Sequence, residues 1–250
     1  MSGHSKWSTI KRKKGAADAR RGKIFSKLIK EITVAAKEGG GDPESNARLK
    51  NVIDKAKQNN MPSDNIERAI RRGSGADSDA SNFEEIIYEG YGPGSVAIYV
   101  EALTDNKNRT AADVRHIFSK NGGKLGSSGV VSYLFQRKGL IQVSKKEFNE
   151  EKIFEAALEA GADDVENGGD MWDVYTEYTQ FNRVKTSMEK AGIEIRNSEL
   201  IMLPSNNVHI GGKDAEAMLR MMEMLEDCDD VQNVWANFDI DVEEMEAFEG

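Results

Sequence analysis

Cysteine, proline and long apolar runs are all scarce in this chain. One cysteine, Cys228, and four prolines occur among 250 residues. A single cysteine excludes an intramolecular disulfide, which fits the reducing cytoplasm, so we expect a cytoplasmic location. No apolar run reaches the roughly 20 residues that cross a bilayer. The basic amino terminus also lacks the apolar segment that a secretory signal needs. We therefore expect no membrane partner.

The residue clusters that support catalysis or hold metals are also missing. The three histidines, His4, His116 and His209, are far apart in sequence, and with one cysteine they give no metal-binding spacing. No Gly-x-Ser-x-Gly segment occurs, and the many carboxylates form no distinctive pair. We predict that the protein is not an enzyme, and that it has no catalytic residues, metal site, cofactor or small-molecule substrate.

Charge, in contrast, is abundant and is separated along the chain. Residues 1–75 contain 18 Lys and Arg against 8 Asp and Glu, a net charge of +10, whereas residues 76–250 contain 16 against 35, a net charge of −19. A polyanion is the natural partner of the basic part, because each phosphate neutralised by Lys or Arg releases condensed counterions. The acidic part repels the same partner and confines binding to one end. We therefore predict a nucleic-acid-binding protein.

The basic excess is densest between Lys6 and Lys30, where ten Lys and Arg accompany one acidic residue. We expect these cations to contact phosphates, and Trp7 or His4 to stack on an unpaired base. The alternative is a solvated tail that only aids solubility. The predicted nucleic-acid contacts in this part are Lys6, Trp7, Lys11, Arg12, Lys13, Lys14, Arg20, Arg21 and Lys23.

Two further groups are candidates for the same partner. Arg68, Arg71 and Arg72 extend the basic patch across a third helix, or else pair with acidic residues at helical spacing. Asn106 and Arg109 lie in a polar loop between a predicted strand and helix. Asp105 or Asn108 accounts for that loop as a helix cap. Arg109 is harder to explain in this way, because the helix dipole disfavours a cation at that end.

Two other stretches invite a functional interpretation that we do not favour. The segment 122–129 has a glycine-rich composition like a phosphate-binding loop, but it lacks the required spacing, and we expect a flexible loop. Four methionines recur at near-helical spacing after residue 217, and we expect them in a core rather than on an adaptable partner surface. They are Met218, Met221, Met222 and Met224.

The first 75 residues have the periodicity of helices. Apolar residues recur from Ile24 to Ala36, Asp42-Pro43 has the form of a new helix start, and Pro62-Ser63 opens a third helix. Residues 73–82 form the best linker candidate.

Strands and helices alternate beyond residue 83. We predict strands at 86–88, 96–103 and 130–135, a helix at 111–120, and then a complete βαββαβ unit between 140 and 202. A strand, a helix and a strand follow. The fold class is therefore multidomain α+β, with an amino-terminal helical domain and two ferredoxin-like α+β domains, one inserted in the other; contiguous domains are the alternative. The predicted boundaries are 1–78, 79–137 with 204–250, and 138–203.

With these residues in view, the chain resembles the YebC/PmpR family, which includes the mitochondrial translational activator of cytochrome c oxidase subunit one. The resemblance runs essentially end to end; Val130 departs from it, because the family more often has a small polar residue there. The matching stretches are residues 3–7, the basic run to Lys14, and residues 18–28, 61–70, 88–93 and 103–110.

The resemblance implies three domains, no enzymatic activity, and nucleic-acid contacts at the basic amino-terminal residues together with Asn106 and Arg109. Family members are described as DNA-binding transcriptional regulators and some as ribosome-associated factors that assist translation. We expect a DNA-binding transcriptional regulator. The alternatives are a translation factor that binds ribosomal RNA on the ribosome, and a protein-interaction adaptor that uses the acidic part.

Overall fold

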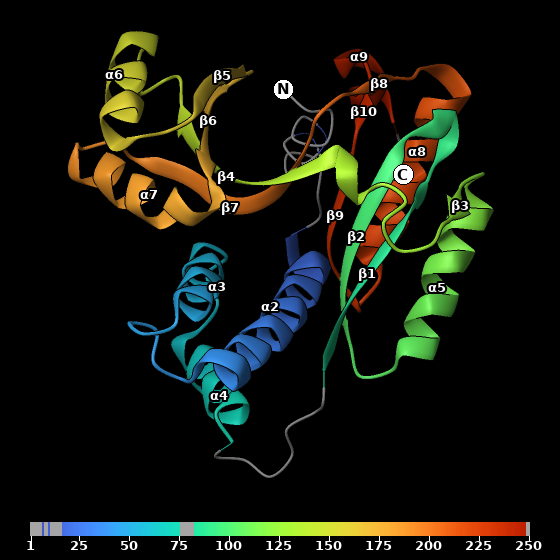
Figure 1. The fold of residues 1–250 in the computed structure, drawn as a ribbon, viewed down its shortest axis with the longest axis horizontal. Helices are drawn as coiled ribbons and strands as arrows, with labels where there is room; N and C mark the ends of the chain where they lie inside the picture. Colours follow the sequence, from blue (N-terminus) through green and yellow to red (C-terminus); the bar gives the residue numbers. More distant parts are fainter. Residues whose placement is uncertain (1–6, 8–9, 11–16, 76–82, 249–250) are drawn as a thin grey trace.

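Three compact units meet at the centre of the molecule (Figure 1). The computed structural model describes residues 7, 10, 17–75 and 83–248, with the backbone alone at 17–20. Residues 17–75 form a helical unit, and two four-stranded sheets with their helices form the first and second sheet units. The predicted linker 76–82 lies outside the described residues.

The helical unit packs three helices around one apolar core. Leu28 and Ile32 of the first helix lie against Leu49 and Val52 of the second. Gly73 on the third lies so close to the first that a Cβ on it would be 2.2 Å from the Thr33 carbonyl oxygen. The helices are α2 (Ala17–Gly39), α3 (Ala47–Gln58) and α4 (Ser63–Gly73).

The predicted restart at Asp42-Pro43 is wrong, because α3 begins at Ala47. The Asn46 side chain is the N-cap and accepts a hydrogen bond from the Leu49 amide at 3.0 Å. Its amide nitrogen also donates to the Ala35 carbonyl at 2.8 Å, which ties the start of α3 to α2. Asparagine at this position satisfies an amide that the helix leaves open, and Asp42 closes the preceding turn instead.

The first sheet unit is antiparallel with strand order β3-β1-β2-β9. Ile98 and Val100 face a core that contains the three fully buried methionines of α8, and Met224 packs beside it. The prediction that these methionines are core residues is confirmed. The elements are β1 (Glu84–Tyr91), β2 (Ala97–Thr104), α5 (Lys107–Lys120), β3 (Lys124–Leu125), α8 (Gly212–Asp227) and β9 (Val231–Ala236). A parallel pair, β8 (Val208–His209) with β10 (Phe238–Asp239), and α9 (Val242–Ala247) complete this unit.

The second sheet unit is a βαββαβ unit with strand order β5-β6-β4-β7. Its elements are β4 (Phe135–Ser144), α6 (Glu150–Ala160), β5 (Asp164–Gly168), β6 (Met171–Glu177), α7 (Phe181–Lys190) and β7 (Ile195–Pro204). All of them lie between β3 and β9 in the sequence. The α+β fold class is therefore confirmed. The exact domain boundaries stay a prediction.

The predicted strand at 130–135 is wrong. A 3-10 turn occupies Ser132–Leu134, and β4 starts only at Phe135. The buried Glu89 carboxylate causes the difference, because it accepts hydrogen bonds from the amides of Gly129 (2.7 Å), Val131 (2.8 Å) and Ser132 (2.8 Å). Segment 122–129 is therefore not a free loop. It contains β3, and the amide of its last residue, Gly129, donates a hydrogen bond to the Glu89 carboxylate.

Across the part of the chain that the structure describes, no helix is both long and apolar enough to cross a membrane.

Candidate nucleic-acid interface

One face of α2 is docked on the end of α8. Lys27 Nζ donates to the Glu226 carbonyl at 2.6 Å, and Lys30 Nζ donates to the Asp229 carbonyl at 3.0 Å. Lys23 Nζ lies 3.2 Å from an Asp227 carboxylate oxygen. Carbonyls at the end of a helix carry partial negative charge, so lysines are favourable there. Three cations of the basic segment therefore already have partners within the chain.

Lys27 is largely buried at this contact. Burial lowers its pKa to about 8, although the neighbouring carboxylates, Glu226 first among them, act in the opposite direction. Desolvation penalises the charged ammonium. At neutral pH Lys27 is therefore still mostly protonated, although its pKa lies only slightly above the pH.

Asp230 joins the helical unit to the first sheet unit. Its carboxylate accepts from Lys30 Nζ at 2.9 Å, Arg109 Nη2 at 2.6 Å and Thr110 Oγ1 at 2.8 Å. Burial raises its pKa, but these hydrogen bonds, that of Arg109 first, outweigh burial and lower the pKa to about 2. Asp230 is therefore ionised at every physiological pH.

Asn106 and Arg109 both make contacts within the chain. Asn106 is the N-cap of α5 and accepts from the Arg109 amide at 3.1 Å, so the prediction that Asp105 or Asn108 caps this helix is wrong. The Arg109 guanidinium lies between Asp230 and Asp105, which raises its pKa and offsets the unfavourable helix dipole. Their contact with nucleic acid stays a prediction.

Trp7 does not present its ring for stacking. Its side chain is 4% exposed and belongs to the core of the first sheet unit, together with Ile10. The indole meets Phe248 edge-on, with ring centres 5.8 Å apart. The expectation that it stacks on a base is corrected here: the apolar area of the ring is used in packing.

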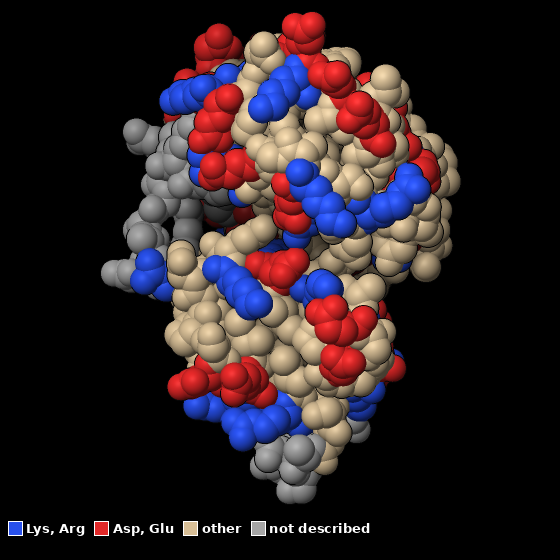
Figure 2. All heavy atoms as spheres, turned by 90° about the vertical axis from the view of Figure 1, so that its left-hand side faces the viewer, with Lys and Arg blue, Asp and Glu red and all other residues tan. Residues whose placement is uncertain are grey.

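The arginines of α4 lie on the outside of the helical unit. Arg68 and Arg71 are exposed, and within the described residues neither forms an ion pair, so pairing with Asp64 or Glu67 is not observed. Arg72 is half-buried. Figure 2 shows Lys and Arg side chains gathered at the lower end of the molecule, where α4 lies.

The other predicted contacts are placed only in part. Arg21 is exposed on α2, and Arg20 lies on the same helix with its side chain outside the described atoms. Lys6, Lys11, Arg12, Lys13 and Lys14 lie outside the described residues.

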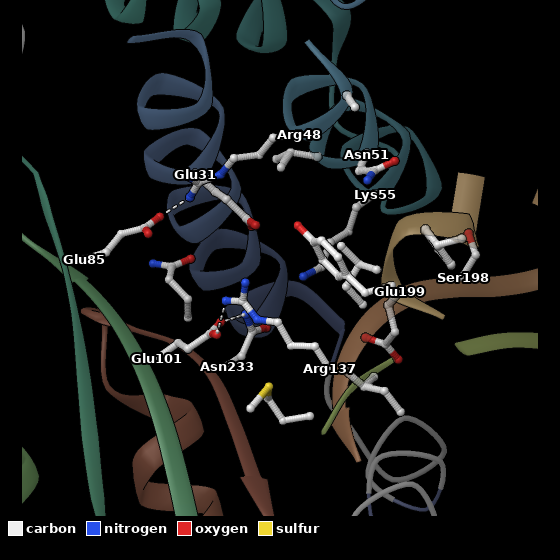
Figure 3. Close-up of a pocket in the computed structure, with 18 of the residues that line it drawn as sticks. Glu31, Arg48, Asn51, Lys55, Glu85, Glu101, Arg137, Ser198, Glu199 and Asn233 are labelled. Atoms are coloured by element: carbon white, nitrogen blue, oxygen red, sulfur yellow. Dashed lines mark hydrogen bonds and ion pairs between the residues drawn. The ribbon is translucent and has the colours of Figure 1, made fainter. Parts of the chain in front are cut away.

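Sequence reasoning missed a cavity of about 680 Å³ where the three units meet (Figure 3). Its walls come from α2 and α3, from β1, β2 and β9, and from β4, β7 and α7. Its polar residues are spread from Glu31 to Asn233, with no common spacing, so no local signal could have indicated it. Among the described residues, no group of three or more His, Cys, Asp or Glu side chains could hold a metal ion.

Known proteins resemble this chain over its full length. Residues 5–76 match the TACO1/YebC protein N-terminal domain, and residues 83–238 match the TACO1/YebC second and third domain. A "probable transcriptional regulatory protein" of Desulforapulum autotrophicum is 57% identical over 99% of this chain and 100% of its own length. Another with the same description, from Geobacter sulfurreducens, is 58% identical over 98% and 99%.

A solved structure also resembles this one. The crystal structure of a conserved hypothetical protein, Aq1575 from Aquifex aeolicus, has a TM-score of 0.83 at 48% identity and covers 90% of this chain and 93% of its own.

Proposed function

The chain belongs to the TACO1/YebC family, and we propose that it is a non-enzymatic, cytoplasmic nucleic-acid-binding regulator. More specifically, it acts as a DNA-binding transcriptional regulator through its basic amino-terminal part. The separation of charge carries this proposal: a net +10 in residues 1–75 against a net −19 in residues 76–250. The relatives named as probable transcriptional regulatory proteins support it.

Phosphate contact is the main source of affinity in this proposal. Arg68 and Arg71 support it, because an exposed arginine without an ion pair in the described chain loses no internal partner on binding a phosphate. Lys27 and Lys30 have a structural role instead, because their contacts with the end of α8 hold the helical unit on the first sheet unit. The basic run from Lys11 to Lys14 supplies the remaining charge.

Binding of this kind discriminates weakly between base sequences. Asn46 and Asn106, two asparagines of the kind that read base edges, are used as helix caps. A ribosome-associated translation factor that binds RNA is therefore the second candidate, because phosphate contacts serve folded RNA equally well.

The test compares the intact protein with a variant in which Lys11, Arg12, Lys13 and Lys14 are all replaced by alanine. Binding to a labelled promoter duplex and to ribosomal RNA is measured by anisotropy, and sedimentation with ribosomes is measured in parallel. We expect the variant to lose at least tenfold in affinity. Unchanged binding would refute the assignment of this surface.

A matched control removes the same number of cations from the acidic part, at exposed lysines that form no ion pair within the described residues. These are Lys120, Lys124, Lys190 and Lys213. Their replacement by alanine leaves affinity within about twofold if the basic part is the binding surface. An equal loss in both variants would show that only net charge matters.

A further inference from the structure

The cavity between the three units is bordered by two strand edges. β7 and β9 are the outer strands of their sheets, and both lie toward the centre of the molecule (Figure 1). Five consecutive residues of β7, Ser198–Met202, line the cavity, and β9 contributes Gln232, Asn233 and Trp235. An outer strand leaves one row of backbone N–H and C=O groups without a partner strand. Such a row is a template for another extended segment.

The charges of the lining do not suit a polyanion. Arg48 is paired with Glu85, and Arg137 lies 3.6 Å from Glu101 (Figure 3). Lys185 lies 3.0 Å from Asp54. Lys55 adds a cation, and Glu31 and Glu199 add two carboxylates. Five carboxylates therefore face four cations. A phosphate chain would meet as much repulsion as attraction, whereas a peptide of mixed charge would not.

Two exposed apolar side chains provide anchors in the same cavity. Ile87 is 46% exposed and Tyr178 is 44% exposed, and both line the wall. The Arg137 guanidinium lies 5.6 Å from the centre of the Tyr178 ring, which holds that ring on the cavity side. Exposed apolar side chains at an enclosed polar surface are typical of a binding site.

We propose that this cavity binds an extended peptide segment of a partner protein, which adds to β7 as a further strand. The backbone of the segment pairs with the outer edge of β7 at Ser198–Met202, and its apolar side chains pack on Ile87 and Tyr178. The site is separate from the proposed nucleic-acid surface on the outside of the helical unit. The nucleic-acid proposal can therefore fail without affecting this one.

The test begins with a displayed library of random heptapeptides selected on the full-length protein. The most enriched sequence is made as a labelled peptide, and its affinity is measured by anisotropy. We expect the Ile87→Ala/Tyr178→Ala variant to bind at least tenfold more weakly. Leu158→Ala is the control, because Leu158 is 80% exposed on α6, outside the cavity, and its loss leaves affinity unchanged. Methylation of alternate backbone nitrogens of the peptide tests strand addition, and we expect it to abolish binding.

Other outcomes would overturn the proposal. A selection without any peptide that binds below about 100 µM excludes a peptide site of useful affinity. Binding that survives the double variant places the peptide elsewhere, and binding that survives N-methylation excludes strand addition. Displacement of the peptide by a single-stranded RNA, without loss in the Lys11–Lys14 alanine variant, would assign the cavity to nucleic acid.

Discussion

Lys30 of α2 and Asp230 of the first sheet unit form an ion pair that joins two units of the molecule. The Nζ and Oδ1 atoms are 2.9 Å apart, and the side chains are only 20% and 6% exposed. The same carboxylate holds Arg109 at the start of α5. One aspartate far away in the sequence therefore helps to hold the basic helical unit in place, together with the contacts of Lys23 and Lys27.

Replacement of Asp230 by asparagine tests this dependence. The variant keeps the size of the side chain but leaves Lys30 and Arg109 without their shared carboxylate. We expect the free energy of unfolding to fall by about 2–3 kcal/mol, measured by urea denaturation at pH 7. Asp105→Asn is the control, because Asp105 is exposed and contacts only the outer side of Arg109. An equal effect of both would contradict a special role for Asp230.

The Asp230 carboxyl also predicts a pH dependence. Its pKa is lowered to about 2 from an unfolded value near 4, so its contribution is complete above pH 4 and is lost as the pH falls toward 2. We expect about 2 kcal/mol of stability to disappear over this range in the wild-type protein and not in Asp230→Asn. The difference between the two unfolding curves at each pH isolates the effect from other carboxylates.

Lys27 predicts a second rise of stability with pH, in the alkaline range. Its pKa in the folded protein is about 8, and an unfolded lysine keeps its proton up to about 10.5. Between these values the unfolded state binds more protons, so stability rises with pH. We expect a gain of about 2–3 kcal/mol relative to Lys27→Met between pH 8 and 10, measured by thermal unfolding. Parallel curves for the two proteins would show that Lys27 is not desolvated.

Alanine has opposite expected effects at two helical glycines, because Gly73 lies at the contact between α2 and α4 and Gly22 does not. Alanine at Gly73 places its Cβ 2.2 Å from the Thr33 carbonyl oxygen, and we expect a loss of about 2–3 kcal/mol. Alanine at Gly22, where nothing lies within 4 Å, stabilises α2 by about 0.5–1 kcal/mol. Urea denaturation measures both. A neutral Gly73→Ala would mean that the two helices separate easily.

We expect the Glu89 carboxylate to protect the amides of segment 129–132 from hydrogen exchange. Burial raises the pKa of this carboxyl, but hydrogen bonds from the amides of Gly129, Val131 and Ser132 lower it more. In Glu89→Gln the charge that holds these amides is lost, and we expect their hydrogen exchange to speed up at least tenfold. Glu85→Gln on the same strand is the control and leaves the exchange unchanged. Equal protection in Glu89→Gln would show that the turn forms without the carboxylate.

The elements predicted correctly from the sequence are those with strong local periodicity. The apolar spacing from Ile24 to Ala36 gives α2, and the methionine spacing gives the buried face of α8. In both helices the apolar residues recur at helical spacing and form the buried face. The local sequence is therefore enough to predict the helix.

The errors arise where a distant residue decides the local structure. Asn46 rather than Asp42 caps α3, and its side chain also reaches Ala35 on the preceding helix. Residues 130–135 do not form the predicted strand, because the carboxylate of Glu89 on β1 accepts a hydrogen bond from the Val131 amide. The strongest partner of Arg109 is Asp230, which follows it by 121 positions. The cavity is a similar case, because all three units contribute to its walls.

The salt dependence of DNA binding tests the central claim most directly. If about six cations of the basic part contact phosphates, log K falls with log salt with a slope of roughly −5, and Arg68→Gln/Arg71→Gln reduces that slope by about 2. The measurement is an anisotropy titration of a labelled duplex between about 50 and 200 mM salt. A slope near zero, or the absence of binding at the lowest salt, would contradict the account.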